Sequence, residues 1–347
     1  MGLGLFEWDA SGRRKHQAVL AIDGGGVRGL IPALVLDYIE KKSGKPIHQC
    51  FSAIAGTSTG GILAAALAAP DTTGARFSAA EVVAFYDDLA PLLFKRRGVA
   101  RLPGGRLLRE LYSSERLEAH LRDRLGEGTR LSQCLTRVLL PTADITHGTG
   151  LVLDSAKAQA GVHTDLPLVR AVRATSAAPT FFRPVSMRSP DGSLMHLVDG
   201  GLYANNPAEL LVHALREPDP RKPPPPSPIP PGAWGGARPL LVISLGTGTP
   251  RARPSGSNLR FATRPRASAA FARTLANDVL NTFPDERLTR AILTRLNVRY
   301  VRFQATLDGD IALDKADAAT RKQLRKAACD LLTTRQKELD ELAAWLQ

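Results

Sequence analysis

The segment AVLAIDGGGVRGL, residues 18–30, joins a short apolar run to a glycine-rich turn. Residues 18–22 carry no charge, and a run of this length before a turn is typical of a buried parallel strand. Residues 30–42 then place apolar side chains at helical spacing, with Pro32 in the first turn, where proline is tolerated. The order of strand, glycine turn and helix indicates an α/β fold.

The same order recurs at once. Residues 50–55, CFSAIA, predict a second strand, residues 56–60, GTSTG, a second sharp turn, and residues 61–69 a second helix. The stretch 46–70 contains no Asp, Glu, Lys or Arg, which also raises the alternative of a membrane span. Six small or polar residues interrupt it, and they favour a turn between a buried strand and a buried helix.

Strand and helix patterns continue to alternate beyond residue 70. Further strands are expected at 137–143, 151–153, 194–198, 240–245 and 298–303, and helices at 79–89, 113–125, 166–176 and 207–215. This alternation predicts an α/β sandwich around a mostly parallel sheet. The proline-rich stretch 218–236 is expected to form a surface loop within the fold, and the tail 314–347 one or two long amphipathic helices.

The cysteines and the N-terminus bear on the cellular compartment. The three cysteines, Cys50, Cys134 and Cys329, are far apart, form no CxxC pair and have no histidine at metal-ligand spacing. They are interpreted as free, mostly buried thiols in a reducing compartment, and no metal and no cofactor is expected. The first 17 residues lack the apolar stretch of a targeting signal, so we expect a cytoplasmic protein.

The chain is strongly basic, with 46 Lys and Arg residues against 33 Asp and Glu residues and a formal net charge of +13. One interpretation is a basic solvated surface without a specific role. The other is attraction to an anionic membrane surface or to nucleic acid. Aromatic residues make up only 5% and are not interleaved with the basic clusters, which favours peripheral contact with anionic lipid and predicts no nucleic-acid partner.

Gly56-Thr57-Ser58-Thr59-Gly60 matches the pattern G-x-S-x-G between a predicted strand and a predicted helix. This is the context of a nucleophile elbow, in which a strained turn exposes the serine hydroxyl above the sheet. An ordinary Gly/Thr/Ser turn is the structural alternative. The flanking strand and helix favour Ser58 as a nucleophile.

Gly24-Gly25-Gly26-Val27-Arg28-Gly29 satisfies the GxGxxG pattern, so a dinucleotide-binding role must be considered. That role needs an acidic residue at the end of the next strand, where this sequence has GTSTG. The alternative is that unobstructed backbone N–H groups at a helix N-terminus, with Arg28 nearby, bind the oxyanion of an acyl-transfer transition state.

Asp199-Gly200-Gly201 follows the predicted strand 194–198. An Asp-Gly turn is common and weak evidence alone, but a serine nucleophile needs a base, and a desolvated carboxylate can serve. Among the seven histidines, only His213 follows Asp199 in the chain, on a predicted helix, where a solvated structural role is favoured.

These motifs, in this order, resemble those of the patatin-like phospholipase family, as do residues 174–182, ATSAAPTFF, and 244–249, SLGTGT. The resemblance implies a three-layer sandwich with a catalytic domain at 18–212 and a continuation of the same fold at 213–347. It implies Ser58 as nucleophile, Asp199 as proton acceptor, and an oxyanion hole at Gly24, Gly25 and Gly26 with Arg28 near. The accompanying motif glycines are Gly29, Gly56, Gly60, Gly200 and Gly201.

The resulting expectation is a serine carboxylic-ester hydrolase of phospholipase A type that cleaves fatty acyl esters of glycerophospholipids or related lipids. A nicotinamide-dependent oxidoreductase that uses GGGVRG and a nucleic-acid or membrane binding module are the alternatives. A patatin-like effector lipase that is activated by a signal also stays open, because no sensor domain is recognisable in the sequence.

Overall fold

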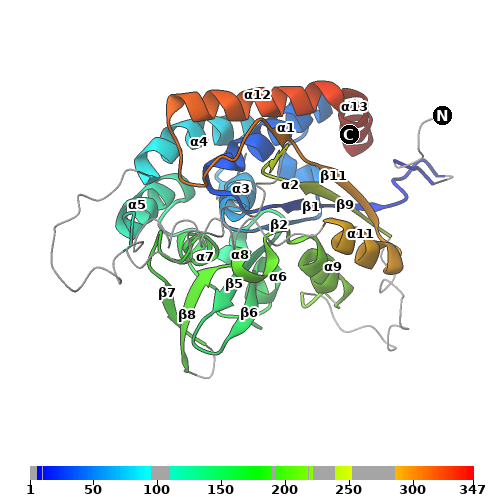
Figure 1. Ribbon diagram of the computed structural model, residues 1–347. Coiled ribbons are helices and arrows are strands. Elements are labelled where there is room, and N and C mark those ends of the chain that lie inside the picture. Colours follow the sequence, from blue (N-terminus) through cyan, green and yellow to red (C-terminus); the bar gives the residue numbers. More distant parts are fainter. Residues whose placement is uncertain are drawn as a thin grey trace.

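The computed structural model describes residues 6–9, 11–94, 110–189, 192–217, 219–221, 239–251 and 286–347. At the centre lies an eight-stranded sheet in the order β11-β9-β1-β2-β5-β8-β7, with β6 also paired to β5 (Figure 1). The strands of this sheet are β1 Gln17–Ile22, β2 Ala53–Gly56, β5 Arg137–Asp144, β6 Thr149–Asp154, β7 Val185–Arg188, β8 Leu194–Asp199, β9 Leu240–Leu245 and β11 Arg299–Phe303.

The strands from β11 to β5 run parallel, whereas β6, β8 and β7 add an antiparallel end. The expectation of a mostly parallel sheet is therefore confirmed. Two short ribbons lie outside it: β3 Pro70–Asp71 with β4 Gly74–Ala75, and β10 Thr249–Pro250 with β12 Thr306–Leu307. Because parallel strands share one direction, β1 and β2 end side by side, and the turns that follow them meet at one edge of the sheet.

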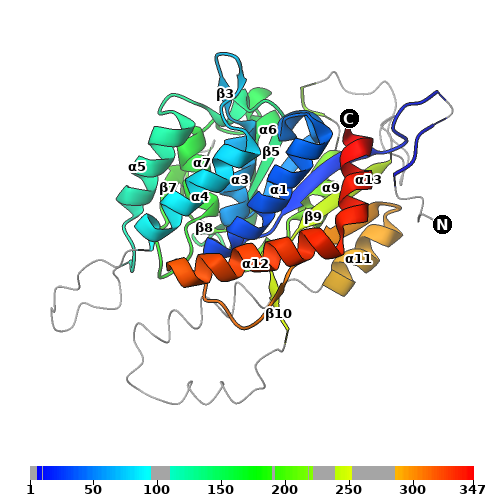
Figure 2. The same ribbon diagram turned by 90° about the horizontal axis from the view of Figure 1, so that it is seen from above.

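Helices cover both faces of the sheet, as the two views at right angles show (Figures 1 and 2). On one face lie α1 Leu30–Ser43, α3 Thr59–Ala68, α4 Ala79–Leu93, α12 Ala318–Thr334 and α13 Gln336–Leu346, and on the other α9 Ala208–Arg216 and α11 Glu286–Arg295. The remaining helical segments are η1 Gly26–Gly29, α2 Ile47–Cys50, α5 Ser114–Leu125, η3 Leu131–Gln133, α6 Ser155–Gln159, α7 Leu168–Thr175 and α8 Gly201–Ala204.

Alternate residues of each central strand enter two separate hydrophobic cores. In β1, Leu20 and Ile22 belong to the large core beneath α1 and α3, while Val19 and Ala21 belong to the smaller core beneath α9. All four are fully buried, which explains why strand β1 has a continuous apolar sequence. Two cores around one sheet make a three-layer α/β sandwich, in agreement with the sequence-based expectation.

Some predicted boundaries are wrong. The strand expected at 50–55 begins only at Ala53, because the residues after Pro46 form the short helix α2. The helix expected from 166 begins at Leu168, because Pro167 occupies its N-cap position. Cys50 is buried as expected, but Cys329 on α12 is exposed, so the thiols are less uniformly buried than the sequence suggested.

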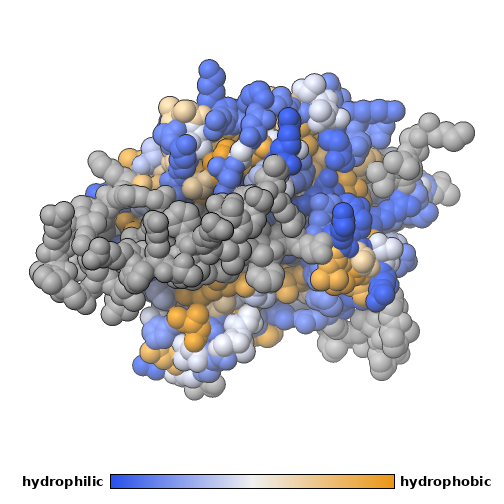
Figure 3. Space-filling view, in the orientation of Figure 1, coloured by the Kyte–Doolittle hydropathy of each residue, from blue (hydrophilic) through white to orange (hydrophobic). Residues whose placement is uncertain are grey.

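The apolar stretch 46–70 forms α2, β2 and α3, and every residue of α3 is buried within the protein. Within the described part of the chain, no helix is both long and apolar enough to cross a membrane. Of the proline-rich stretch, Pro218 and residues 222–236 lie outside the described residues. The face seen in Figure 3 is mostly hydrophilic over the helical layer, with apolar residues gathered lower down near β7 and β8, where Leu194 is exposed.

Candidate active site

Ser58 occupies the sharp turn between β2 and α3. Its backbone angles are φ 53° and ψ −117°, which a residue with a side chain adopts only under strain. The turn is tight because the Gly60 backbone lies directly against the carbonyl of Ile22 at the end of β1, where a Cβ atom would collide. Ser58 is half-buried while its neighbours are buried, so the turn presents this one side chain at the edge of the sheet.

Segment 175–177, at the C-terminal end of α7, holds the backbone of Ser58 from both sides. The Ser58 N–H donates to Thr175 Oγ1 at 3.1 Å, and Ser176 Oγ donates to the Ser58 carbonyl at 3.2 Å. The sequence marks 174–182 only as a family-like stretch and predicts no role for these two residues. Their role depends on a tertiary contact, for which the local sequence carries no signal.

Asp199 ends β8 and is anchored by the same segment. Its N–H donates to the Ala177 carbonyl at 3.0 Å, and the Gly200 N–H donates to the Thr175 carbonyl at 3.4 Å. One short segment therefore fixes both Ser58 and Asp199 relative to each other. Gly200 packs tightly against the carbonyl of Pro141, which leaves no room for a side chain.

The Asp199 carboxyl group is fully buried without a cationic partner among the described residues. Oδ1 accepts a hydrogen bond from the Gly201 N–H at 2.8 Å, whereas the buried Oδ2 accepts none in this part of the chain. Burial raises the pKa of Asp199 to about 7, although the Ser58 hydroxyl and the Gly201 N–H act to lower it. A carboxyl group with this pKa can exchange a proton near neutral pH.

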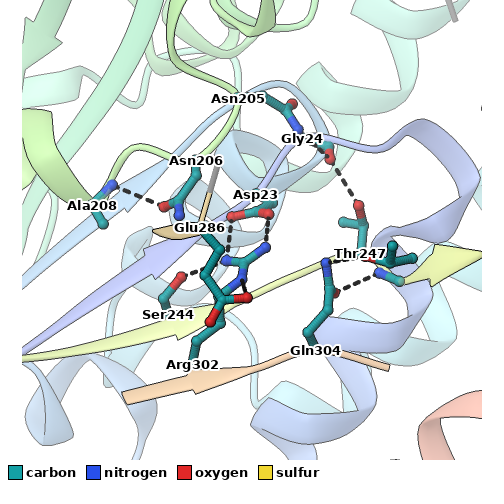
Figure 4. A network of polar contacts seen from close by, with 12 residues as sticks. Asp23, Gly24, Asn205, Asn206, Ala208, Ser244, Thr247, Glu286, Arg302 and Gln304 are labelled. Carbon is teal, nitrogen blue, oxygen red and sulfur yellow. Dashed lines mark hydrogen bonds and ion pairs between the residues drawn. The ribbon is translucent and has the colours of Figure 1, made fainter. Parts of the chain in front are cut away.

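The glycine loop after β1 lies beside Ser58 in the same cavity. The Gly24 N–H already donates to the Asn205 carbonyl at 3.1 Å, and Thr247 Oγ1 donates to the Gly24 carbonyl at 2.9 Å (Figure 4). Gly25 and Gly26 line the cavity, and no hydrogen bond from either N–H is found among the described residues. Gly26 has φ +57°, a left-handed conformation that glycine adopts without strain.

The candidate oxyanion hole therefore contains fewer of the predicted residues than the sequence suggests. In the described part of the chain the N–H groups of Gly25 and Gly26 have no acceptor, whereas the Gly24 N–H is bound to the Asn205 carbonyl. Arg28 is buried in η1 and is not among the residues that line the cavity, and burial lowers its pKa to about 10. Thr59, at the start of α3, lines the cavity next to Ser58, in the position where the residue after a nucleophile supplies a backbone donor.

The cavity divides into a polar end and an apolar end. Ser58, Asp199 and the loop glycines form the polar end. The apolar end is lined by residues of α4, α5 and the segment after α7, namely Leu89, Leu93, Leu117, Phe181 and Phe182. No histidine of the described residues lines this cavity, and His213 is exposed on α9.

Fold and site together define a three-layer α/β protein with a serine on a strained strand-to-helix turn, a buried carboxyl group and a glycine loop around one cavity. The model of the patatin-like phospholipase family matches residues 20–212, which contain all three of these features. The chain belongs to the patatin-like phospholipase family. This membership leaves the dinucleotide-binding alternative without support, since β2 ends at the serine turn and not at an acidic residue.

Individual relatives agree with the family assignment. The chain is 32% identical over 331 residues to patatin-like protein 2 of Arabidopsis thaliana, covering 88% of this chain and 79% of the relative. It is 36% identical over 253 residues to patatin-like protein 1 of the same plant, covering 67% of this chain and 58% of the relative. Among solved structures, VipD from Legionella pneumophila aligns with a TM-score of 0.38 at 13% identity, covering 95% of this chain and 70% of that one.

Proposed function

We propose that this protein is a lipid acyl hydrolase of phospholipase A type, in which Ser58 and Asp199 form a catalytic dyad. The observation that carries the proposal is the pairing of a strained, half-buried serine with a fully buried carboxyl group whose pKa is about 7, in a cavity without a histidine among the described residues. A nucleophilic serine requires a base within reach, and Asp199 is the carboxyl group among the described residues that line this cavity.

In the first half of the proposed reaction, ionised Asp199 takes the proton of the Ser58 hydroxyl as its oxygen attacks the acyl carbonyl. The tetrahedral oxyanion that forms accepts hydrogen bonds from the Gly25 and Gly26 N–H groups. Collapse of this intermediate transfers the proton from Asp199 to the leaving alcohol and leaves the acyl group on Ser58. In the second half, Asp199 takes a proton from a water molecule as the water oxygen attacks the acyl carbon. Collapse of the second tetrahedral intermediate breaks the bond to Ser58 Oγ, Asp199 returns the proton to this oxygen, and the fatty acid is released.

The shape of the cavity supports a fatty acyl substrate. Its apolar end, formed by side chains of α4, α5 and the segment after α7, suits a hydrocarbon chain, while the reacting ester would lie at Ser58. The alcohol part of the substrate, and with it the phospholipid head group, would remain outside this apolar end.

We also infer that residues 18–212 and 213–347 act as one catalytic unit. Strand β1 of the first range is paired with β9 of the second along six consecutive residues, from Gln17 with Leu240 to Ile22 with Leu245. The glycine loop follows directly after this pairing. Removal of β9 would therefore leave one side of the loop unsupported.

The test is incubation of the pure protein with vesicles of mixed phospholipids, followed by mass spectrometry of the products. The proposal predicts release of free fatty acid with a lysophospholipid as the matching product, and no release by the Ser58→Ala variant. Absence of released fatty acid from every lipid offered, or equal release by Ser58→Ala, would overturn it.

A further inference from the structure

Asp23 directly precedes the glycine loop, and its side chain holds the start of the loop. The Asp23 carboxylate is 2% exposed and binds the guanidinium of Arg302 through both oxygens, with Nη1 to Oδ1 at 3.1 Å and Nη2 to Oδ2 at 2.5 Å (Figure 4). Two parallel hydrogen bonds to a carboxylate fix direction as well as distance. The carboxylate is therefore held in one orientation at the point where β1 becomes the loop.

The sheet register explains how an arginine two strands away reaches this position. Arg302 on β11 lies opposite Ser244 on β9, and Ser244 lies opposite Ala21 on β1. Side chains at paired positions share one face of the sheet, and Asp23 follows two residues after Ala21 on that face. The small side chains of Ser244 and Ala21 let the guanidinium cross β9, and Ser244 Oγ accepts a hydrogen bond from Nη1 at 2.7 Å.

Further contacts fasten the loop from the same part of the chain. The Asp23 N–H donates to the Leu245 carbonyl at 3.0 Å, Thr247 Oγ1 donates to the Gly24 carbonyl, and the Val27 N–H donates to the Leu313 carbonyl at 2.8 Å. These partners, like Arg302, lie beyond residue 212, outside the range matched by the family model. Within that range, Asn205 and Thr59 also contact the loop, the latter through its Oγ1, which donates to the Gly26 carbonyl at 2.9 Å. Ser58 and Asp199 are held by residues 175–177.

We propose that Arg302 is a positioning residue for the oxyanion hole, which acts by holding Asp23 so that the Gly25 and Gly26 N–H groups point at the developing oxyanion. The inference rests on the proposed hydrolase function. The peptide plane that carries the Gly25 N–H is held at the Gly24 carbonyl by Thr247 Oγ1, and the plane that carries the Gly26 N–H is held at the Gly25 carbonyl by the Arg28 N–H at 3.1 Å. The Asp23–Arg302 pair fixes the residue from which both planes follow, so its loss should shift these planes together. Donors that act on the oxyanion stabilise the transition state more than the bound substrate, so their misalignment lowers kcat rather than raising KM.

The chain offers a matched control in a second buried bidentate pair. Arg137 binds Asp154 with Nε to Oδ1 at 3.1 Å and Nη2 to Oδ2 at 2.6 Å, and both side chains are at most 4% exposed. Arg137 begins β5 and lies opposite Ala53, at the start of β2, whereas Arg302 lies toward the strand ends that carry the loop. Loss of either arginine leaves a buried carboxylate without its cation, but only Arg302 contacts the glycine loop.

The experiment compares Arg302→Gln, Arg302→Lys and Arg137→Gln in the full chain, with a short soluble ester as substrate. We expect kcat to fall about 10- to 100-fold in both Arg302 variants, with KM within about twofold of wild type, since one oxyanion donor is worth about 100-fold or more. Arg137→Gln should lower the melting temperature about as much as Arg302→Gln while kcat stays within about threefold. Arg302→Lys keeps the charge but not the bidentate geometry. If Arg302→Gln does not fold, the kcat of Arg302→Lys tests the inference instead.

Wild-type kcat in a folded Arg302 variant, or an equal loss of kcat in Arg137→Gln, would overturn this inference. The wild-type protein is treated in parallel with a fluorophosphonate, which labels an activated serine. If Ser58 is labelled and the Arg302 variants keep wild-type kcat, only the proposed role of Arg302 is contradicted. A wild-type protein that neither hydrolyses the ester nor accepts the label contradicts the hydrolase function itself.

Discussion

Asp23 and Asp199 are both buried carboxyl groups at the ends of strands beside the same glycine loop, yet their surroundings differ in one respect. Asp23 has a guanidinium on both oxygens, whereas Asp199 has the Gly201 N–H on one oxygen and no cation in the described part of the chain. Burial raises the pKa of both groups, and at Asp23 the Arg302 guanidinium acts in the opposite direction. A paired carboxylate serves as a fixed anchor, whereas an unpaired one is free to exchange a proton.

The largest expected effect comes from removal of the reactive side chains. Ser58→Ala and Asp199→Asn should each lower kcat by about 10^3-fold or more, and the double variant should be no worse, because the two residues act as one unit. Steady-state hydrolysis of a soluble ester by the three variants measures this. If Asp199→Asn kept near-normal turnover while His213→Ala lost it, a triad with histidine would replace the dyad.

A smaller loss is expected from the loop that Asp23 anchors. Gly25→Ala should lower kcat by about 100-fold with little change in KM, because the oxyanion donor acts in the transition state. A Cβ atom at Gly25 would also collide with the side chain of Thr247, which shifts the loop further. Thermal unfolding of the variant must be recorded with its kinetics, and unchanged kcat in a folded Gly25→Ala protein would remove the loop from the mechanism.

The two carboxyl groups should affect stability with opposite signs. Asp23→Asn removes the bidentate carboxylate from the buried Arg302 guanidinium, which keeps the partly exposed Glu286 carboxylate at 3.8 Å from Nε, and should destabilise the fold by about 3 kcal/mol at pH 8. Asp199→Asn should instead stabilise it at pH 8, because the folded state holds the Asp199 proton up to a pKa of about 7, while the unfolded chain releases it near its ordinary value of 3.8.

The sign follows from the protons bound in each state. Between about pH 4 and pH 7 the folded protein retains a proton that the unfolded chain has lost, so stability falls as pH rises through this window, by at most about 4 kcal/mol. The benefit of Asp199→Asn should disappear near pH 4. Denaturant unfolding at pH 4 and pH 8 tests both variants, and equal destabilisation by both at pH 8 would mean that the two environments do not differ as described.

The smallest expected effect concerns the basic surface. If the net charge of +13 serves lipid recognition, hydrolysis should be faster on anionic than on neutral vesicles and should slow as salt rises. Exposed charges are screened over about 10 Å at 0.1 M salt, whereas the buried site is not. A short soluble ester is the control and should be nearly independent of salt. Equal rates on both kinds of vesicle would assign the charge no role in docking.

The sequence predicted those parts of the fold and site that local patterns encode. Ser58 lies on the predicted turn. A strained serine between a strand and a helix requires small neighbours, and these small residues form a motif that can be recognised in the sequence. Thr175 and Arg302 could not be found in this way. Their partners are more than a hundred residues distant, and the contacts depend on sheet register and on how α7 packs. The predicted start of β2 was wrong for a related reason, since Pro46 begins a short helix within an otherwise apolar run.

The most direct measurement is the rate at which a fluorophosphonate labels Ser58 as a function of pH, with the modified peptide identified by mass spectrometry. With Asp199 as base and its pKa at about 7, the rate should rise about tenfold per pH unit below pH 7, level off above it, and be lost in Asp199→Asn. Labelling at another residue, or labelling of Ser58 at the same rate in Asp199→Asn as in wild type, would contradict the Ser58–Asp199 dyad.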